Sequence, residues 1–207
     1  PDENLIPEME LNKYSPKSLP LGDATNEAKK EVEKTKKELE KLKAFILKKY
    51  PFTQSISILP PQSAKDFVEE EVGEKNKELP EEKFEKLTKK MHLFMVVPEE
   101  KFKEIPKIRK TIVEQIDRDK KDIWIHLKTP VDIWEMGFDS KFELISAIAV
   151  SFPLYDKGIL TALRVAEIHK SLVLQKFERY VVSYVIAGSI VRGDVTKTSD
   201  VDAFVII

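Results

Sequence analysis

The chain has 207 residues, enough for one large domain or two small ones around an extensive hydrophobic core. Lysine and arginine (35) nearly balance aspartate and glutamate (36), so no overall positive field favours nucleic-acid binding and any such contact has to be local. The sequence lacks cysteine, which excludes disulfides and thiolate-rich zinc sites, and it lacks an apolar stretch of membrane-spanning length.

The N-terminal fifth of the sequence divides into an arm and a helix. Residues 1–22 contain four prolines and no clear periodicity, which predicts an irregular arm. Residues 23–50 carry apolar side chains at alternating steps of four and three, which predicts one long amphipathic helix. This helix is suited to a coiled-coil dimer or to packing on its own domain, and its short apolar stripe favours packing.

Residues 51–155 are predicted to form an α/β accessory domain. Strand patterns occur at 52–59, 91–97 and 123–128. Helical patterns separate them, at 62–90 with an interruption at Gly73, and from Ile105 to Ile116. Strands that alternate with helices favour a three-stranded βαβαβ region with parallel neighbours. The predicted fold class is therefore α/β (α+β).

Two more helices are predicted before the C-terminal segment. Ser140 and Glu143 form a capping-box pattern that opens the first of them. Its apolar positions continue to Phe152, and Pro153 is predicted to end it. The second helix is predicted over 158–177, directly before the final apolar strand.

The C-terminal segment carries the pattern with the clearest chemistry. An apolar strand leads into Gly188-Ser189, and after ten intervening residues Asp200-Val201-Asp202 begins a second apolar stretch. Gly188 permits close approach of the backbone to a phosphate, and the Ser189 hydroxyl adds a donor. Asp200 and Asp202, two apart in a strand, project from one face, where paired carboxylates suit Mg²⁺. The pattern predicts a site for a metal-bound triphosphate.

At these residues the chain resembles the DNA polymerase β-like nucleotidyltransferase superfamily. The signature of that superfamily is an apolar strand, Gly-Gly or Gly-Ser, a spacer, and Asp-x-Asp within a second strand. The run GSIVRGD at 188–194, followed by SDVD at 199–202, is most similar to minimal and kanamycin-type members, particularly archaeal ones. The resemblance assigns 156–207 to the N-terminal part of the catalytic domain. A charged fraction of 34%, mostly Lys and Glu, is in addition typical of thermophile proteins.

The resemblance also implies roles for the matching residues. Gly188 and Ser189 would bind the β- and γ-phosphates of a nucleoside triphosphate such as ATP, and Arg192 would contact phosphate. Asp200 and Asp202 would be the catalytic carboxylates and would hold two Mg²⁺ or Mn²⁺ ions. The implied reaction moves a nucleoside monophosphate to an acceptor hydroxyl and releases pyrophosphate.

Several features of activity and assembly stay open at this point. Family members use a third carboxylate on a later strand, so this chain alone is expected to be inactive or nearly so. The alternative is a non-catalytic nucleotide-binding or protein-interaction module. The acceptor is RNA, protein or a small molecule, because one metal site serves all of these. A cytoplasmic location without membrane contact is expected, since no signal pattern is seen.

The apolar strand at 203–207 is expected to present an exposed edge. Such an edge favours pairing with another molecule or shielding by the N-terminal arm or helix. A homodimer through the N-terminal helix or through this edge is therefore an expectation of the sequence.

The histidines and tryptophans carry weaker signals. His92, His126 and His169 are far apart and lack metal-ligand spacing, which favours core or solvated roles. Trp124 and Trp134 have the chemistry to stack on a base, but packing roles are favoured for isolated aromatic residues.

Overall fold

The structure is a computed structural model that describes residues 26–73, 80–196 and 199–207. The chain divides into two compact units, with the boundary between Leu39 and Glu40. The first helix, α1 (Asn26–Lys49), crosses that boundary and confirms the predicted long helix over this range. The arm predicted at 1–22 lies outside the described residues.

The second unit contains a four-stranded sheet with the order β3–β2–β1–β4. Its strands are β1 (Ser55–Ile58), β2 (Met91–Val96), β3 (Ile123–Lys128) and β4 (Phe152–Asp156). β2 and β3 are parallel, whereas β1 runs antiparallel to both β2 and β4. The mixed α/β class is therefore confirmed, and the expectation of parallel neighbours is correct for β2 and β3 but wrong for β1.

The connections between the strands explain these directions. Two helices that pack on each other, α2 (Ala64–Gly73) and α3 (Glu81–Thr88), join β1 to β2 after a short 3₁₀ turn, η2 (Pro61–Ser63). A helix pair that runs out and back returns the chain to the end of the sheet that it left, so β2 is antiparallel. A 3₁₀ segment, η3 (Glu99–Glu104), and a single long helix, α4 (Ile105–Arg118), join β2 to β3 and carry the chain back along the sheet.

The fourth strand was not anticipated from the sequence. Helix α6 (Phe142–Val150) ends before Phe152, and the next residues form β4 at the edge of the sheet. Pro153 is opposite Ser57 in this ladder, which an edge strand tolerates because the missing N–H removes only one ladder bond. The helical spacing of apolar residues therefore predicted this helix correctly but wrongly extended it to Phe152.

The predicted capping box at Ser140 is also wrong. Lys141 is the residue that precedes α6, and it makes no side-chain cap. A capping box occurs instead at the start of α5 (Pro130–Phe138), where Thr129 and Asp132 exchange two hydrogen bonds. It uses aspartate at its third position rather than the glutamate or glutamine of the usual pattern.

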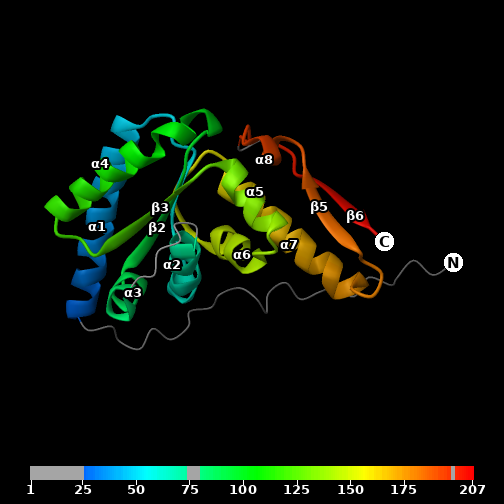
Figure 1. Cartoon of the computed structure of the whole chain (residues 1–207), viewed down its shortest axis with the longest axis horizontal. Helices are drawn as coiled ribbons and strands as arrows, with labels where there is room; N and C mark the ends of the chain where they lie inside the picture. The colour runs from blue at the N-terminus through cyan, green and yellow to red at the C-terminus, as the bar shows by residue number, and fades with distance from the viewer. Residues whose placement is uncertain (1–25, 74–79, 197–198) are drawn as a thin grey trace. The chain divides into compact units, whose positions relative to one another are not determined.

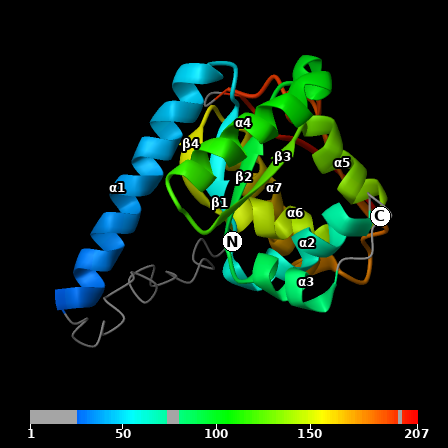
Figure 2. The ribbon, with the colours of Figure 1, turned by 60° about the vertical axis from the view of Figure 1, so that its left-hand side comes forward.

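Helices cover both faces of the sheet. In Figures 1 and 2, α4 lies on one face, and α2, α6 and α7 (Ile159–Phe177) lie on the other. α7 confirms the helix predicted over 158–177. The hydrophobic core on its side of the sheet includes Phe94 of β2, Ile148 of α6 and Leu163 of α7. None of the described helices is long and apolar enough to cross a bilayer.

The C-terminal elements form a two-stranded antiparallel sheet, made of β5 (Ser183–Ala187) and β6 (Asp202–Ile206). The short helix α8 (Ser189–Arg192) follows β5 directly. Ile190 of α8 and Val195 after it belong to the same core as α5, α6 and α7. The predicted division into 51–155 and 156–207 stays a prediction, but the hydrophobic core runs across it.

Replacing Ile190 by alanine tests how strongly this core holds the loop. Ile190 is 0% exposed, whereas the adjacent Val191 is 36% exposed. We expect Ile190→Ala to lower the free energy of unfolding by about 2–5 kcal/mol, because it opens a cavity in the core. Val191→Ala should change it by about 0.5 kcal/mol or less. Urea unfolding followed by circular dichroism measures both, and equal effects would show that Ile190 does not anchor the loop.

Candidate functional site

The carboxylate of Asp202 lies directly against the backbone of Gly188. The antiparallel register sets Asp202 opposite Ala187, the residue before Gly188. A Cβ atom built on Gly188 would collide with Oδ2 of Asp202, and Gly188 has φ +77°. Both the space and the backbone angle therefore require glycine. The sequence suggested that Gly188 makes room for a phosphate; in the structure it makes room for the carboxylate.

The loop after Gly188 is tightly closed. Ser189 is half-buried at the start of α8, and its carbonyl accepts the N–H of Asp194 at 3.1 Å. Gly193 ends α8 in the left-handed conformation with φ +74°. Arg192 is exposed, and its Nε lies 3.7 Å from Oδ2 of Asp194. Arg192, the residue predicted to contact phosphate, therefore lies exposed to solvent beside the loop, with a long ion pair to Asp194.

Asp200 and Asp202 are both exposed, but their backbone settings differ. β6 begins at Asp202, so Asp200 lies before the strand and the same-face argument does not extend to it. Within the described ranges, no group of three or more His, Cys, Asp or Glu residues is arranged to hold a metal ion. Carboxylate oxygens are nevertheless the ligands that Mg²⁺ and Mn²⁺ prefer, so the chemistry of this pair fits such an ion.

Side chains from the α/β part hold the loop in place. Trp134 of α5 donates its indole N–H to the carbonyl of Val191 at 2.9 Å. Gln54, just before β1, donates from Nε2 to the carbonyl of Gly193 at 2.8 Å. Pro130 lies so close to Gly193 that a Cβ there would be 2.5 Å from Pro130 Cγ. The position of the Gly-Ser loop is thus set by elements more than fifty residues away.

A second contact fixes the far side of the same loop. Gly158, at φ +141°, lies against Thr196, and a Cβ at Gly158 would be 2.7 Å from the Thr196 carbonyl carbon and oxygen. Asp156 accepts the N–H groups of Gly158 and Leu160 through Oδ1, which holds the first turn of α7. The start of α7 and the end of the loop are consequently packed as one piece.

Comparison with known protein families identifies this C-terminal segment. Residues 166–207 match the nucleotidyltransferase-domain family. The match begins within α7, includes β5, α8 and β6, and covers about a fifth of the chain. It supports the nucleotidyltransferase superfamily and hence, at a general level, a transferase. No curated protein and no solved structure matched the chain.

The histidine within the matched segment, His169, does not join the loop. Nδ1 of His169 is 2.8 Å from the hydroxyl of Tyr184, across α7 and β5. Burial, followed by the charge of Glu167, raises the pKa of Tyr184 above its usual value. His169 is therefore a partner of Tyr184 on the outside of the segment.

The other two histidines meet in the core of the α/β part. Nδ1 of His92 on β2 lies 2.8 Å from Nε2 of His126 on β3, and both side chains are buried. His126 in turn lies 3.2 Å from a carboxylate oxygen of Glu71 on α2. Arg109 and Trp124 each donate a hydrogen bond to Glu71, at 2.9 and 3.1 Å. No sequence pattern indicates this cluster, because its members are far apart in the chain.

Burial and neighbouring charges shift two pKa values in this cluster. Burial by itself raises the pKa of Glu71, but the hydrogen bond and charge of His126, together with Arg109, outweigh it and lower the value to about 2. Burial and then the charge of His126 lower the pKa of His92 from 6.5 to about 4. At neutral pH the structure therefore favours ionised Glu71 and neutral His92.

Gly188→Ala tests the close approach of Asp202. The new Cβ would collide with the carboxylate and would also occupy a left-handed backbone, so we expect a loss of about 1–3 kcal/mol in the free energy of unfolding. Gly73→Ala is the matched control, because a Cβ at Gly73 meets nothing within 4 Å. Thermal unfolding of both variants measures the difference, and equal stability would contradict the observed packing.

His92→Gln tests the buried histidine by its pH dependence. A histidine whose pKa is lowered on folding supports the fold fully above pH 6.5 and loses that contribution as the pH falls toward 4. Between pH 7.5 and 5 we expect the free energy of unfolding of the native protein to fall by about 2 kcal/mol because of His92, and we expect His92→Gln to lack that decrease.

His169→Gln is the control, because His169 is exposed, and it should keep the native dependence of the free energy of unfolding on pH. Urea unfolding at several pH values gives both slopes; identical slopes for His92→Gln and the native chain would refute the assignment.

Proposed function

We propose that the chain binds a nucleoside triphosphate at the Gly188–Asp202 contact, as one part of a site for metal-dependent nucleotidyl transfer to an acceptor hydroxyl. The observation that carries the proposal is the register of β5 and β6, which puts the Asp202 carboxylate against Gly188 at the start of the loop. A phosphate that contacts the loop backbone would therefore lie next to a carboxylate, and an anion can approach a carboxylate closely only with a cation between them.

Several groups near Gly188 would each make part of the contact with the triphosphate. Backbone N–H groups after Gly188 and the hydroxyl of Ser189 would donate hydrogen bonds to the phosphates. Arg192, exposed at the rim, would pair with phosphate oxygens in place of its distant contact with Asp194. The contacts of Gln54 and Trp134 keep the loop in position, so little ordering entropy would be lost on binding.

Asp200 and Asp202 are the residues that would hold the divalent metals. When bound, Mg²⁺ or Mn²⁺ would supply charge neutralisation of the triphosphate and of the oxygens that attack and leave. Asp202 is held by its strand, whereas Asp200 belongs to the loop before it. Asp202 is therefore the member of the pair whose backbone position is fixed by a strand.

Calorimetric titration with each of the four nucleoside triphosphates tests the proposal. In 5 mM Mg²⁺ one or more should bind, and Asp202→Asn should weaken that binding about tenfold or more, since a carboxylate of the metal pair is lost. Asp200→Asn should act in the same direction. Removal of the metal with EDTA should reproduce the loss in the native chain.

Glu178→Gln is the matched control for these variants. Glu178 is an exposed carboxylate at the end of α7, in the same segment but outside the loop. It should bind the triphosphate as the native chain does. Absence of triphosphate binding by the native chain, or equal binding by Asp202→Asn, would overturn the proposal.

Transfer is tested separately from binding. Labelled triphosphates offered with RNA, protein or aminoglycoside acceptors show whether label is moved and pyrophosphate released. Little or no transfer by these 207 residues stays the prediction, and robust turnover would refute it. Association into a homodimer likewise stays a prediction, which light scattering measures.

A further inference from the structure

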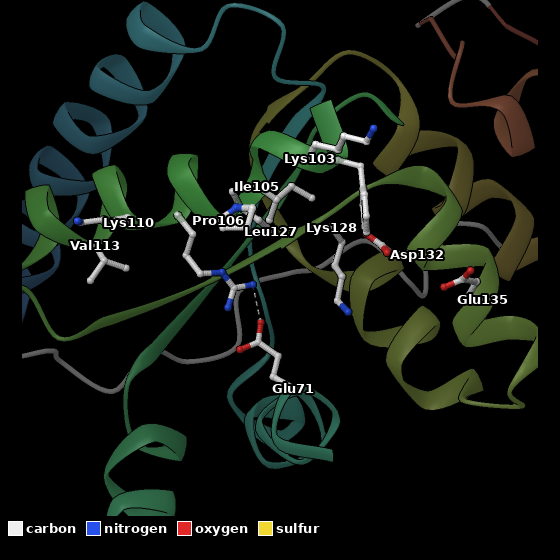
Figure 3. A pocket seen from close by; sticks show the side chains of 12 residues that line it. Glu71, Lys103, Ile105, Pro106, Lys110, Val113, Leu127, Lys128, Asp132 and Glu135 are labelled. Carbon is white, nitrogen blue, oxygen red and sulfur yellow. Dashed lines mark hydrogen bonds and ion pairs between the residues drawn. The ribbon is translucent and has the colours of Figure 1, made fainter. Parts of the chain in front are cut away.

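A large groove lies along β3, away from the Gly-Ser loop contacts described above. Its volume is about 880 Å³, and α4, β3 and α5 form its walls. Figure 3 shows Ile105 and Leu127 at its back, with Lys128 of β3 and Glu71 of α2 reaching into the same space. Apolar and charged surfaces therefore meet in one concave site, as is typical of small-molecule pockets.

A buried cluster of polar side chains lies behind this groove. Three contacts follow one another, from the Leu87 carbonyl to His92, from His92 to His126, and from His126 to Glu71. At its end, the carboxyl of Glu71 is ionised at neutral pH because its pKa is lowered to about 2, and it holds Arg109 beside the groove.

Burial separates the carboxylate of this cluster from solvent. Glu71 is 4% exposed, so water compensates little of its charge, and Arg109 is its ionic partner at 2.9 Å. A ligand in the groove would meet the other side of this guanidinium, whose positive charge suits an anion.

Arg109 is the group best placed to bind that anion. It lines the groove, and its Nη2 is tied to Glu71 at 2.9 Å. Among the described residues that is the one hydrogen bond recorded for its guanidinium, which has five N–H groups. A guanidinium held in place by a buried carboxylate is ready to bind a carboxylate or phosphate with its remaining donors.

We propose that this groove binds a small organic anion, whose carboxylate or phosphate group pairs with Arg109 and whose apolar part lies on Val113 and Leu127. This proposal does not depend on the proposed nucleotidyl transfer. Its ligand class follows from the remaining donors of Arg109 and the apolar lining of the groove.

The two tryptophans provide a direct test in the full chain. The indole N–H of Trp124 donates to Glu71 beside the groove, whereas that of Trp134 donates to Val191. In a ¹⁵N-labelled sample these are the two indole signals, because the sequence has two tryptophans. Benzoate and phenyl phosphate serve as anionic probes, and benzamide as the neutral probe of similar shape. We expect one or both anions to shift the Trp124 signal to saturation and to leave Trp134 in place.

Variants on α4 decide whether Arg109 makes the contact. Arg109→Gln should weaken the binding of the active probe about tenfold or more. Lys107→Gln removes one charge from the same helix at an exposed position outside the groove and should bind as the native chain does. If Arg109→Gln does not fold, Arg109→Lys replaces it, since it keeps the charge beside Glu71 and removes the fork; it too should weaken binding.

The outcomes separate the two ligand chemistries. Response to benzoate alone identifies a carboxylate site, response to phenyl phosphate alone a phosphate site, and response to both a general oxyanion site. The proposal is overturned if neither anion moves the Trp124 signal, if benzamide moves it equally, or if the Arg109 variants bind like the native chain.

Discussion

The burial of Ile190 joins two parts of the molecule that the sequence presents as separate. The Gly-Ser loop carries Ile190, whose side chain is 0% exposed and enters the same core as α5, α6 and α7. Once Ile190 is buried, the loop carbonyls come within reach of Gln54 and Trp134. The antiparallel pairing of β5 with β6 then sets Asp202 against Gly188. The geometry of the candidate site therefore depends on hydrophobic packing beneath it.

This arrangement gives the α/β part a physical role in the candidate site. A loop held only by its own strands would open and close at little cost, because its backbone hydrogen bonds face solvent. Here the carbonyls of Val191 and Gly193 are held by side chains from α5 and from the start of β1. Elements of the α/β part therefore fix the position of the loop.

The buried cluster of Glu71, His92 and His126 is costly for a purely structural core. Burying charged and titratable groups stabilises a fold weakly, since desolvation offsets most of the attraction. Apolar side chains of similar volume would serve packing as well. The cluster lies behind a groove and shares Arg109 with it, so its position suits a binding function.

Local patterns predicted much of the fold correctly. The helices of α4 and α7 followed from apolar spacing, and the buried strand β2 followed from a continuous apolar run. Errors arose where the deciding contact was not local. Phe152 continued a helical period but joined an edge strand, because β1 offered it a ladder partner. β1 ran antiparallel because the α2–α3 pair returned the chain to the end it left.

The sequence by itself was enough to predict a chemistry for the C-terminal segment. Gly188, Ser189 and the Asp200–Asp202 pair were recognisable because their types and spacing are local properties of the chain. The tertiary structure alone decided what surrounds them. Gln54 lies 139 residues before the carbonyl it holds, and His92 and His126 become neighbours only through parallel pairing of β2 and β3. Contacts of this kind arise from the packing of whole elements, and no local pattern of residues encodes them.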